Sequence, residues 1–222
     1  MAIPWQTIES IDTDEGILEL RKRGDKDYLI TIAGRVLMNS TSNRSEILLS
    51  QITCNSLNNK KNARVLIGGL GMGYTLKAAL NNLPDDARVV VAELNPVVVK
   101  WCSGPIAHLT NNALNDPRVT IEIADVADII KKADNEFDAI ILDLYEGPFE
   151  AAKDRGGHLY GADALRSSSS ALVPGGIFAV WSEDPDKAFE RRLVQTGFTF
   201  KSHRPPRGSR HIVYIAKRSK HK

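Results

Sequence analysis

Hydrophobic and polar positions change their pattern along the chain. Residues 14–38 alternate short β-type runs with polar turns, which predicts a small antiparallel β unit. A helix is expected next, because Ser42 or Asn43 can cap it and Glu46 supplies an acid in its first turn. The first part of the chain is therefore predicted to be a β unit followed by one connecting helix.

From residue 64 onward, short and nearly continuous β-branched runs alternate with helical lengths. Such runs indicate a parallel sheet that is covered on both faces. The polar stretch 58–62 marks the boundary, so we predict a β unit with its connecting helix at 1–61 and an α/β, Rossmann-like domain at 62–222. We expect a mostly parallel, seven-stranded sheet with strands at 64–67, 89–92, 119–123, 139–142 and 177–181, helices that begin near 73, 95, 126, 161 and 186, and a closing antiparallel hairpin of 198–200 and 212–216.

Composition narrows the class of protein. Hydrophobic residues make up 42% of the chain and charged residues 25%, as in ordinary soluble globular proteins. No signal-peptide pattern opens the sequence and no long apolar run follows, so we expect a cytoplasmic enzyme with no membrane partner. Cys54 and Cys102 lie far apart without neighbouring ligand residues, which predicts neither a disulfide framework nor a metal site.

Basic residues gather at the end of the chain. Residues 201–222 hold eight Lys or Arg and no acid, which leaves a net charge of −6 for the first 200 residues. A solvated strand with a frayed terminus explains this segment, and RNA binding is the alternative, so nucleic acid is not the expected partner. We expect a homodimer, because a small β unit is marginal without a packing partner.

The strongest motif is a glycine-rich turn, residues 68–73, between the first strand of the large sheet and a helix. Gly69, Gly71 and Gly73 let the backbone turn tightly and approach a ligand, and the helix N-terminus offers free N–H groups. A dinucleotide fits less well, because Tyr74 stands where the fingerprint needs a small residue, and no P-loop lysine follows. The expected ligand is an adenosyl sulfonium, S-adenosylmethionine or its decarboxylated form, and a purely structural turn is the alternative.

Three carboxylates follow three of the predicted strands. Glu93 is expected to accept hydrogen bonds from both ribose hydroxyls. Asp125 is placed to contact adenine or, alternatively, to cap the helix that begins at residue 126. Asp143 is expected to hold and deprotonate an amine acceptor, because a free alkylammonium has a pKa of about 10.4 and must lose a proton before it attacks carbon. A capping or anchoring role is the alternative for Asp143.

The residues after Asp143 are candidates for an acceptor pocket. Tyr145 and Glu146 are expected to line it, with a solvated loop as the alternative. His158 and Tyr160 are expected to close over the site, although an isolated loop histidine is commonly structural.

Six short motifs occur in order between residues 64 and 185. They are 65–69, the acid Glu93 with 96–98, 116–119, 136–143, 156–160 and 182–185. In this order they resemble the spermidine synthase family, aminopropyltransferases built on a methyltransferase-type sheet with a small N-terminal β domain. The resemblance implies that Glu93 binds ribose, Asp125 binds adenine and Asp143 is the acid-base residue, with a small amine such as a polyamine as the acceptor.

Three positions depart from the family pattern. The family's glycine loop carries an Asp that holds the donor's aminopropyl ammonium, whereas residues 70–72 contain no acid. Its Tyr-His-Glu is Arg44-Ser45-Glu46 here, and its glutamine after the Gly34 turn is Leu37 or Met38. These changes remove aminopropyl and diamine contacts while keeping the adenosine contacts, which suggests a branch with a changed donor or acceptor.

Two reactions therefore remain open, aminopropyl transfer and methyl transfer. Both are displacements at a carbon next to a sulfonium, and neither needs a metal. A non-catalytic nucleoside-binding or RNA-binding module on the same fold is the alternative class.

Overall fold

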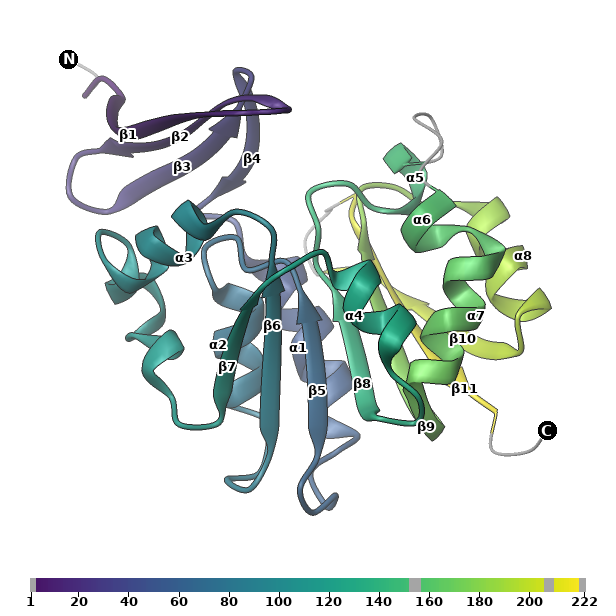
Figure 1. The fold of residues 1–222 in the computed structure, drawn as a ribbon. Helices are drawn as coiled ribbons and strands as arrows, with labels where there is room; N and C mark the ends of the chain where they lie inside the picture. Colours follow the sequence, from purple (N-terminus) through teal and green to yellow (C-terminus); the bar gives the residue numbers. More distant parts are fainter. Residues whose placement is uncertain (1–2, 152–156, 206–209, 220–222) are drawn as a thin grey trace.

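A computed structural model describes residues 3–151, 157–205 and 210–219, without the side chains of 150, 151, 157 and 158. Its strands form a four-stranded sheet of order β1-β2-β3-β4 and a seven-stranded sheet of order β10-β11-β9-β8-β5-β6-β7 (Figure 1). The small sheet consists of β1 (Gln6–Thr13), β2 (Gly16–Arg23), β3 (Asp27–Ile32) and β4 (Arg35–Asn39).

The small sheet is antiparallel throughout, and one of its faces is apolar. Leu18 pairs with Ile32 and Leu20 with Ile30, and all four side chains are buried. Because side chains alternate along a strand, Glu19 and Thr31 between them face the opposite side, where the Thr31 hydroxyl donates to Glu19. The apolar face packs into the same hydrophobic cluster as the large sheet. In Figure 1 the small sheet lies beyond the carboxyl ends of the central strands.

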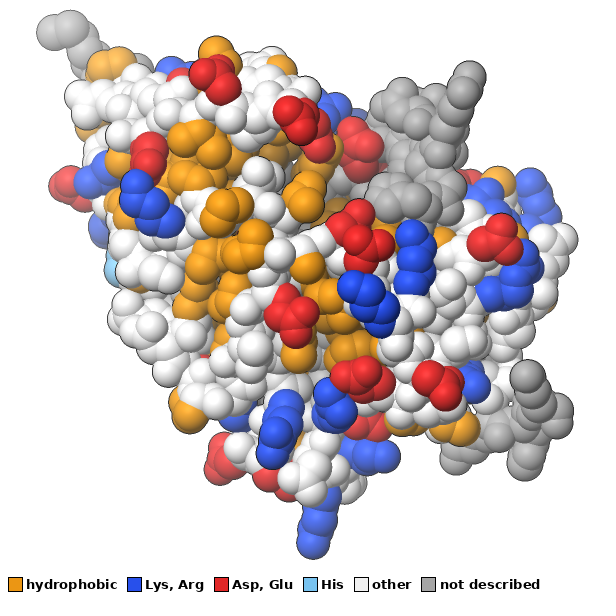
Figure 2. Space-filling view, in the orientation of Figure 1, with side chains coloured by type: hydrophobic (Ala, Val, Ile, Leu, Met, Phe, Trp, Pro, Cys, Tyr) orange, Lys and Arg blue, Asp and Glu red, His pale blue; other side chains and the backbone are white. Residues whose placement is uncertain are grey.

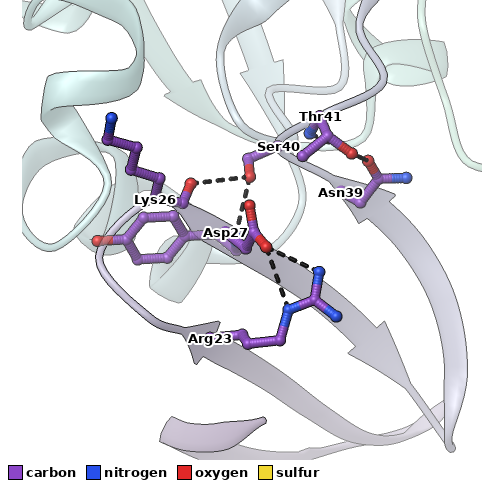
Figure 3. Close-up of polar contacts among 7 residues, drawn as sticks. Arg23, Lys26, Asp27, Asn39, Ser40 and Thr41 are labelled. Atoms are coloured by element: carbon purple, nitrogen blue, oxygen red, sulfur yellow. Dashed lines mark hydrogen bonds and ion pairs between the residues drawn. The ribbon is translucent and has the colours of Figure 1, made fainter. Parts of the chain in front are cut away.

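Hydrogen bonds fix the end of β4, where the chain leaves the small sheet (Figure 3). The Tyr28 N–H donates to Ser40 Oγ at 2.9 Å, and this hydroxyl donates to the Lys26 carbonyl at 3.2 Å. Arg23 donates to Asp27 from Nε and Nη2 at 3.1 and 2.7 Å. The Ser40 contacts tie the end of β4 to the β2–β3 hairpin before the connecting helix α1 (Arg44–Asn55), and the Arg23–Asp27 pair lies within that hairpin.

Parallel pairing dominates the large sheet. The neighbours β9, β8, β5, β6 and β7 run parallel, and β11 pairs antiparallel with both β9 and β10. The predicted α/β fold, with its mostly parallel seven-stranded sheet and small antiparallel sheet, is confirmed. The strands are β5 (Arg64–Gly68), β6 (Arg88–Glu93), β7 (Val119–Ile123), β8 (Phe137–Leu142), β9 (Leu172–Ser182), β10 (Phe198–His203) and β11 (Ile212–Arg218).

Helices cover the large sheet on both faces, so alternate strand residues enter different hydrophobic clusters. On β8, Ile141 belongs to the cluster that includes the small sheet, and Ile140 belongs to the other. Beside α1, the helical segments are α2 (Tyr74–Leu80), α3 (Pro96–Ser103), η1 (Ala107–Thr110), η2 (Ala113–Asn115), α4 (Val126–Lys132), α5 (Pro148–Ala151), α6 (Gly157–Tyr160), α7 (Ala162–Ala171) and α8 (Lys187–Gln195).

Some elements differ from the sequence-based expectation. The strand β1 and the short segments α5, α6, η1 and η2 were not expected, and β9 begins at Leu172 rather than at residue 177. Asn43 precedes α1 but makes no side-chain capping hydrogen bond. Within the described ranges, no helix has the length and hydropathy needed to cross a bilayer.

Candidate functional site

A cavity of about 440 Å³ opens at the carboxyl ends of the central strands. The small sheet forms one wall, and the loops after β5, β6, β7 and β8 form the other. Figure 2 shows hydrophobic side chains gathered on the face between the two sheets. The cavity therefore lies where open α/β sheets bind their ligands.

The glycine-rich loop between β5 and α2 forms part of the floor. Gly69 has φ 88°, and a Cβ there would lie 2.5 Å from the Asp143 carbonyl oxygen. Gly71 has φ 53°, and a Cβ there would lie 2.8 Å from Met38 Sδ. Gly73 has φ 81° and directly precedes α2, but it is not part of the cavity wall that the described residues form. Gly69 and Gly71 thus line the cavity while the loop packs closely against Asp143 and Met38, and their contact with a cofactor stays a prediction.

Glu93 ends β6 and is buried beside this loop. Its Oε2 accepts the Leu70 N–H at 2.9 Å, and its Oε1 accepts the Asn95 N–H at 2.8 Å. Burial raises the pKa of Glu93, and the backbone hydrogen bonds oppose that rise. Glu93 also lines the cavity, and its contact with ribose hydroxyls stays a prediction.

Asp125 precedes α4 and also lines the cavity. Its Oδ1 accepts the Ala127 N–H at 2.8 Å, which is a helix N-cap contact. Asp125 therefore caps α4, which was the alternative role predicted from the sequence. Contact with adenine remains a prediction.

Asp143 follows β8 and is half-buried on the cavity floor. The Thr75 hydroxyl donates to its Oδ2. Burial, and then repulsion from Glu46, raise the pKa of Asp143 to about 7, while the Thr75 hydrogen bond acts in the opposite direction. A carboxyl group with a pKa near neutrality can both accept and release a proton under ordinary conditions.

Glu46 lines the cavity, and before the structure only the family resemblance of residues 44–46 drew attention to it. It projects from the first turn of α1, and burial raises its pKa. Its Oε2 accepts the Ser45 hydroxyl at 2.7 Å, and Ser45 Oγ lies 3.3 Å from His211 Nδ1. The sequence shows an acid at this helical position, but it does not show that the side chain turns toward Asp143.

The loop after β8 forms the cavity mouth. Tyr145 is exposed, and its hydroxyl donates to the Glu15 carboxylate. Glu146 accepts a hydrogen bond from Arg35 at 3.4 Å. Tyr160 is buried, lines the cavity and donates its hydroxyl to the Glu146 carbonyl at 3.0 Å.

His158 lies in α6, but its side chain is outside the described part of the chain. Its predicted role over the site therefore stays a prediction.

The cavity is strongly acidic. Six carboxylates line the described part of its wall, and no Lys, Arg or His does. The ranges that the structure describes contain no group of three or more His, Cys, Asp or Glu side chains placed to hold a metal ion. An acidic pocket attracts a ligand that carries positive charge. The six residues are Glu15, Glu46, Glu93, Asp125, Asp143 and Glu146.

Comparison with known proteins agrees with this geometry. The family model of the spermine/spermidine synthase domain matches residues 46–196. The polyamine aminopropyltransferase of Clostridium tetani is 35% identical over 122 residues, which is 55% of this chain and 41% of that protein. Putrescine N-methyltransferase 2 of Nicotiana attenuata is 36% identical over 121 residues, which is 54% of this chain and 31% of that protein. The chain thus matches less than half the length of these curated relatives.

The solved structures show the same fold. Spermidine synthase from Thermotoga maritima superposes with a TM-score of 0.76 at 22% identity, covering 97% of this chain and 73% of that one. A spermidine synthase in complex with the transition-state analogue AdoDATO superposes with a TM-score of 0.75 at 22% identity.

Proposed function

This chain belongs to the spermine/spermidine synthase family, and from that membership we propose that it transfers an alkyl group from an S-adenosylmethionine-type donor to a small amine. The group transferred is aminopropyl or methyl. The observation that carries the proposal is Asp143, a carboxyl group with a raised pKa in an acidic cavity, next to a glycine loop and a strand-end glutamate.

The floor of the cavity fits the nucleoside part of such a donor. A side chain on Gly69 would collide with the Asp143 backbone, so the glycine lets this loop pack against the end of β8 while it also lines the cavity. Glu93 offers its remaining acceptor positions to the ribose hydroxyls, and Asp125 lies at the end of the next strand. When bound, the donor supplies a carbon activated by its neighbouring sulfonium.

Asp143 and its neighbours would prepare the acceptor. The amine arrives as an ammonium, because its pKa in water is about 10.4, and the acidic cavity attracts that charge. Asp143 takes one proton, and the freed lone pair forms the new C–N bond as the C–S bond breaks and a neutral thioether leaves. The protein contributes positioning and one proton acceptor, which suffice for a displacement on an activated carbon.

The donor end of the cavity leaves the choice between the two reactions open. Met38 Sδ accepts the Met72 N–H at 3.1 Å and fills the space beside Gly71. A donor bound on this loop would therefore meet the Met38 thioether there, and residues 70–72 supply no carboxylate. Related proteins named for aminopropyl transfer and for putrescine N-methylation are similarly close to this chain, so methyl transfer is a specific second candidate.

The first experiment is a calorimetric titration with S-adenosylmethionine, decarboxylated S-adenosylmethionine and methylthioadenosine, followed by turnover with putrescine. We expect Asp143→Asn to lower kcat on the order of 10²-fold to 10⁴-fold, with nucleoside affinity preserved. The matched control is Asp163→Asn, which changes an exposed acid on α7. Methylthioadenosine as product identifies aminopropyl transfer, and S-adenosylhomocysteine identifies methyl transfer. Full turnover by Asp143→Asn would refute the assigned role.

A further inference from the structure

Two turns of the small sheet reach the mouth of the cavity together. One turn joins β1 to β2 at residues 14–15, and the other joins β3 to β4 at residues 33–34. A Cβ on Gly16 would lie 2.9 Å from the Ala33 Cβ, so the turns pack closely against each other. Ala33 has φ 47°, a left-handed conformation that costs a non-glycine residue about 1–2 kcal/mol. The side chains in or beside these turns, Glu15 and Arg35, lie at the mouth of the cavity.

These flanking side chains contact the loop after β8. The Tyr145 hydroxyl donates to Glu15, and Arg35 Nη2 donates to Glu146 Oε1 at 3.4 Å. The Arg35 guanidinium carbon also lies 5.5 Å from the centroid of the Tyr145 ring, within the range of a cation–π contact. Arg35 is therefore a cation that the protein itself holds against the aromatic ring and the carboxylate of the mouth.

The carboxylates of the cavity differ in depth and in the charges near them. Glu46 is buried and Asp143 is half-buried, and neither has an ion pair with a Lys or Arg among the described residues. Glu146 lies nearer the solvent, with 28% of its side chain exposed, and it already pairs with Arg35. An incoming amine thus finds unneutralised negative charge deep in the cavity and a positive charge at the mouth.

We propose that Arg35, which pairs with Glu146 at the mouth but does not itself line the cavity, supplies a positive charge there and so restricts the acceptor to a monoamine or a short diamine. A longer polyamine would place an additional ammonium at the mouth, where it must compete with Arg35 for Glu146 and is repelled by the guanidinium. This inference names the acceptor class of the proposed alkyl transfer and rests on it. Arg35 acts here as a specificity-determining residue at the mouth, separate from Asp143.

The test compares the binding of putrescine and spermidine by calorimetry, using protein saturated with methylthioadenosine. We expect Arg35→Ala to shift the ratio of the two dissociation constants about threefold or more in favour of spermidine, the size of effect that an exposed ion pair supports. Arg35→Lys retains the charge and should keep most of the original preference. The matched control is Arg166→Ala, which removes an exposed arginine paired with Asp163 on α7, away from the cavity.

An unchanged ratio in a folded Arg35→Ala protein would overturn the inference, and so would a preference for spermidine in the unaltered chain. Failure of both amines to bind any variant would overturn it as well. Binding of amines without transfer of any alkyl group would instead refute the proposed function, while the ratio would still decide the role of Arg35.

Discussion

At the scale of single residues, the pair of Glu46 and Asp143 sets the protonation of the cavity. Both carboxyl groups lie out of bulk water, and the charge of Glu46 adds to the effect of burial on the pKa of Asp143. The Ser45 hydroxyl links Glu46 to His211. The pKa of His211 is lowered, chiefly by burial, and the charge of Glu46 opposes that shift. Helical periodicity places Glu46 in the first turn of α1 but cannot show these contacts, because His211 comes from the other end of the chain.

This coupling predicts a pH effect for Glu46→Gln. Removing the negative charge lowers the pKa of Asp143, so the ionised form that accepts a proton persists to lower pH. The acidic limb of the kcat/KM profile, expected near pH 7 from the pKa of Asp143, should therefore move to lower pH. Profiles are compared with those of Glu122→Gln, an exposed acid on β7. A limb that stays in place, or that moves to higher pH, would contradict the coupling.

At the scale of elements, the turn between β5 and α2 shows what sequence can and cannot reveal. The spacing of its glycines indicates that the backbone must approach a ligand or another segment. The partner of Gly71 is Met38, however, which belongs to β4 of the small sheet. No local pattern predicts a contact between segments that are separated in sequence and joined only by the tertiary fold.

We expect Gly69→Ala to cost more than the backbone conformation alone explains. A left-handed alanine costs about 1–2 kcal/mol, and the clash with the Asp143 carbonyl should raise the total to about 3 kcal/mol or more. Gly197→Ala is the matched control, since Gly197 has φ 89° with no atom within 4 Å of a Cβ. Urea unfolding measures both losses, and methylthioadenosine titration should show weaker binding only for Gly69→Ala. Equal losses of stability would contradict the clash.

Strand and helix assignments from the sequence succeed where apolar periodicity is strong. The buried runs of β5, β6 and β8 are expected and found. The strand β1 lacks this signal, because half or more of its side chains are exposed. Residues 174–176, Pro-Gly-Gly, suggest a turn, yet they lie inside β9, which explains the late start expected for that strand.

At the scale of the whole molecule, one hydrophobic cluster joins the small sheet to the large one. Leu18 and Leu20 of β2 share it with Val65 and Ile67 of β5. The sequence predicted that four residues meet at one edge, because each follows a parallel strand and parallel strands end at a common edge. The cavity is lined by all four, Gly69, Glu93, Asp125 and Asp143. Glu15 was not expected there, since the position of the small sheet over that edge depends on this shared cluster, and Met38 and Glu46 entered only through the family resemblance. The boundary between residues 61 and 62, the homodimer and the cytoplasmic location stay predictions.

The shared cluster predicts a single cooperative unfolding transition. Leu20 is fully buried, so Leu20→Ala should lower stability by about 2–5 kcal/mol. Far-ultraviolet circular dichroism and tryptophan fluorescence should report the same, lower Tm. Val194→Ala, at an exposed position on α8, serves as the control and should change Tm little. Two separate transitions in either protein would show that the sheets unfold independently.

The contacts across the cavity mouth also bear on how long a product stays bound. If the proposed donor binds on the glycine loop, its spent nucleoside thioether would lie behind the contacts of Tyr145 with Glu15 and of Arg35 with Glu146. We expect its dwell time to follow how often the two turns of the small sheet lift away from the loop after β8. In many enzymes such an opening step, and not the chemical step, limits the rate. The pace of successive reaction cycles would then be set by hairpin motion at the mouth and not by the bond that is made.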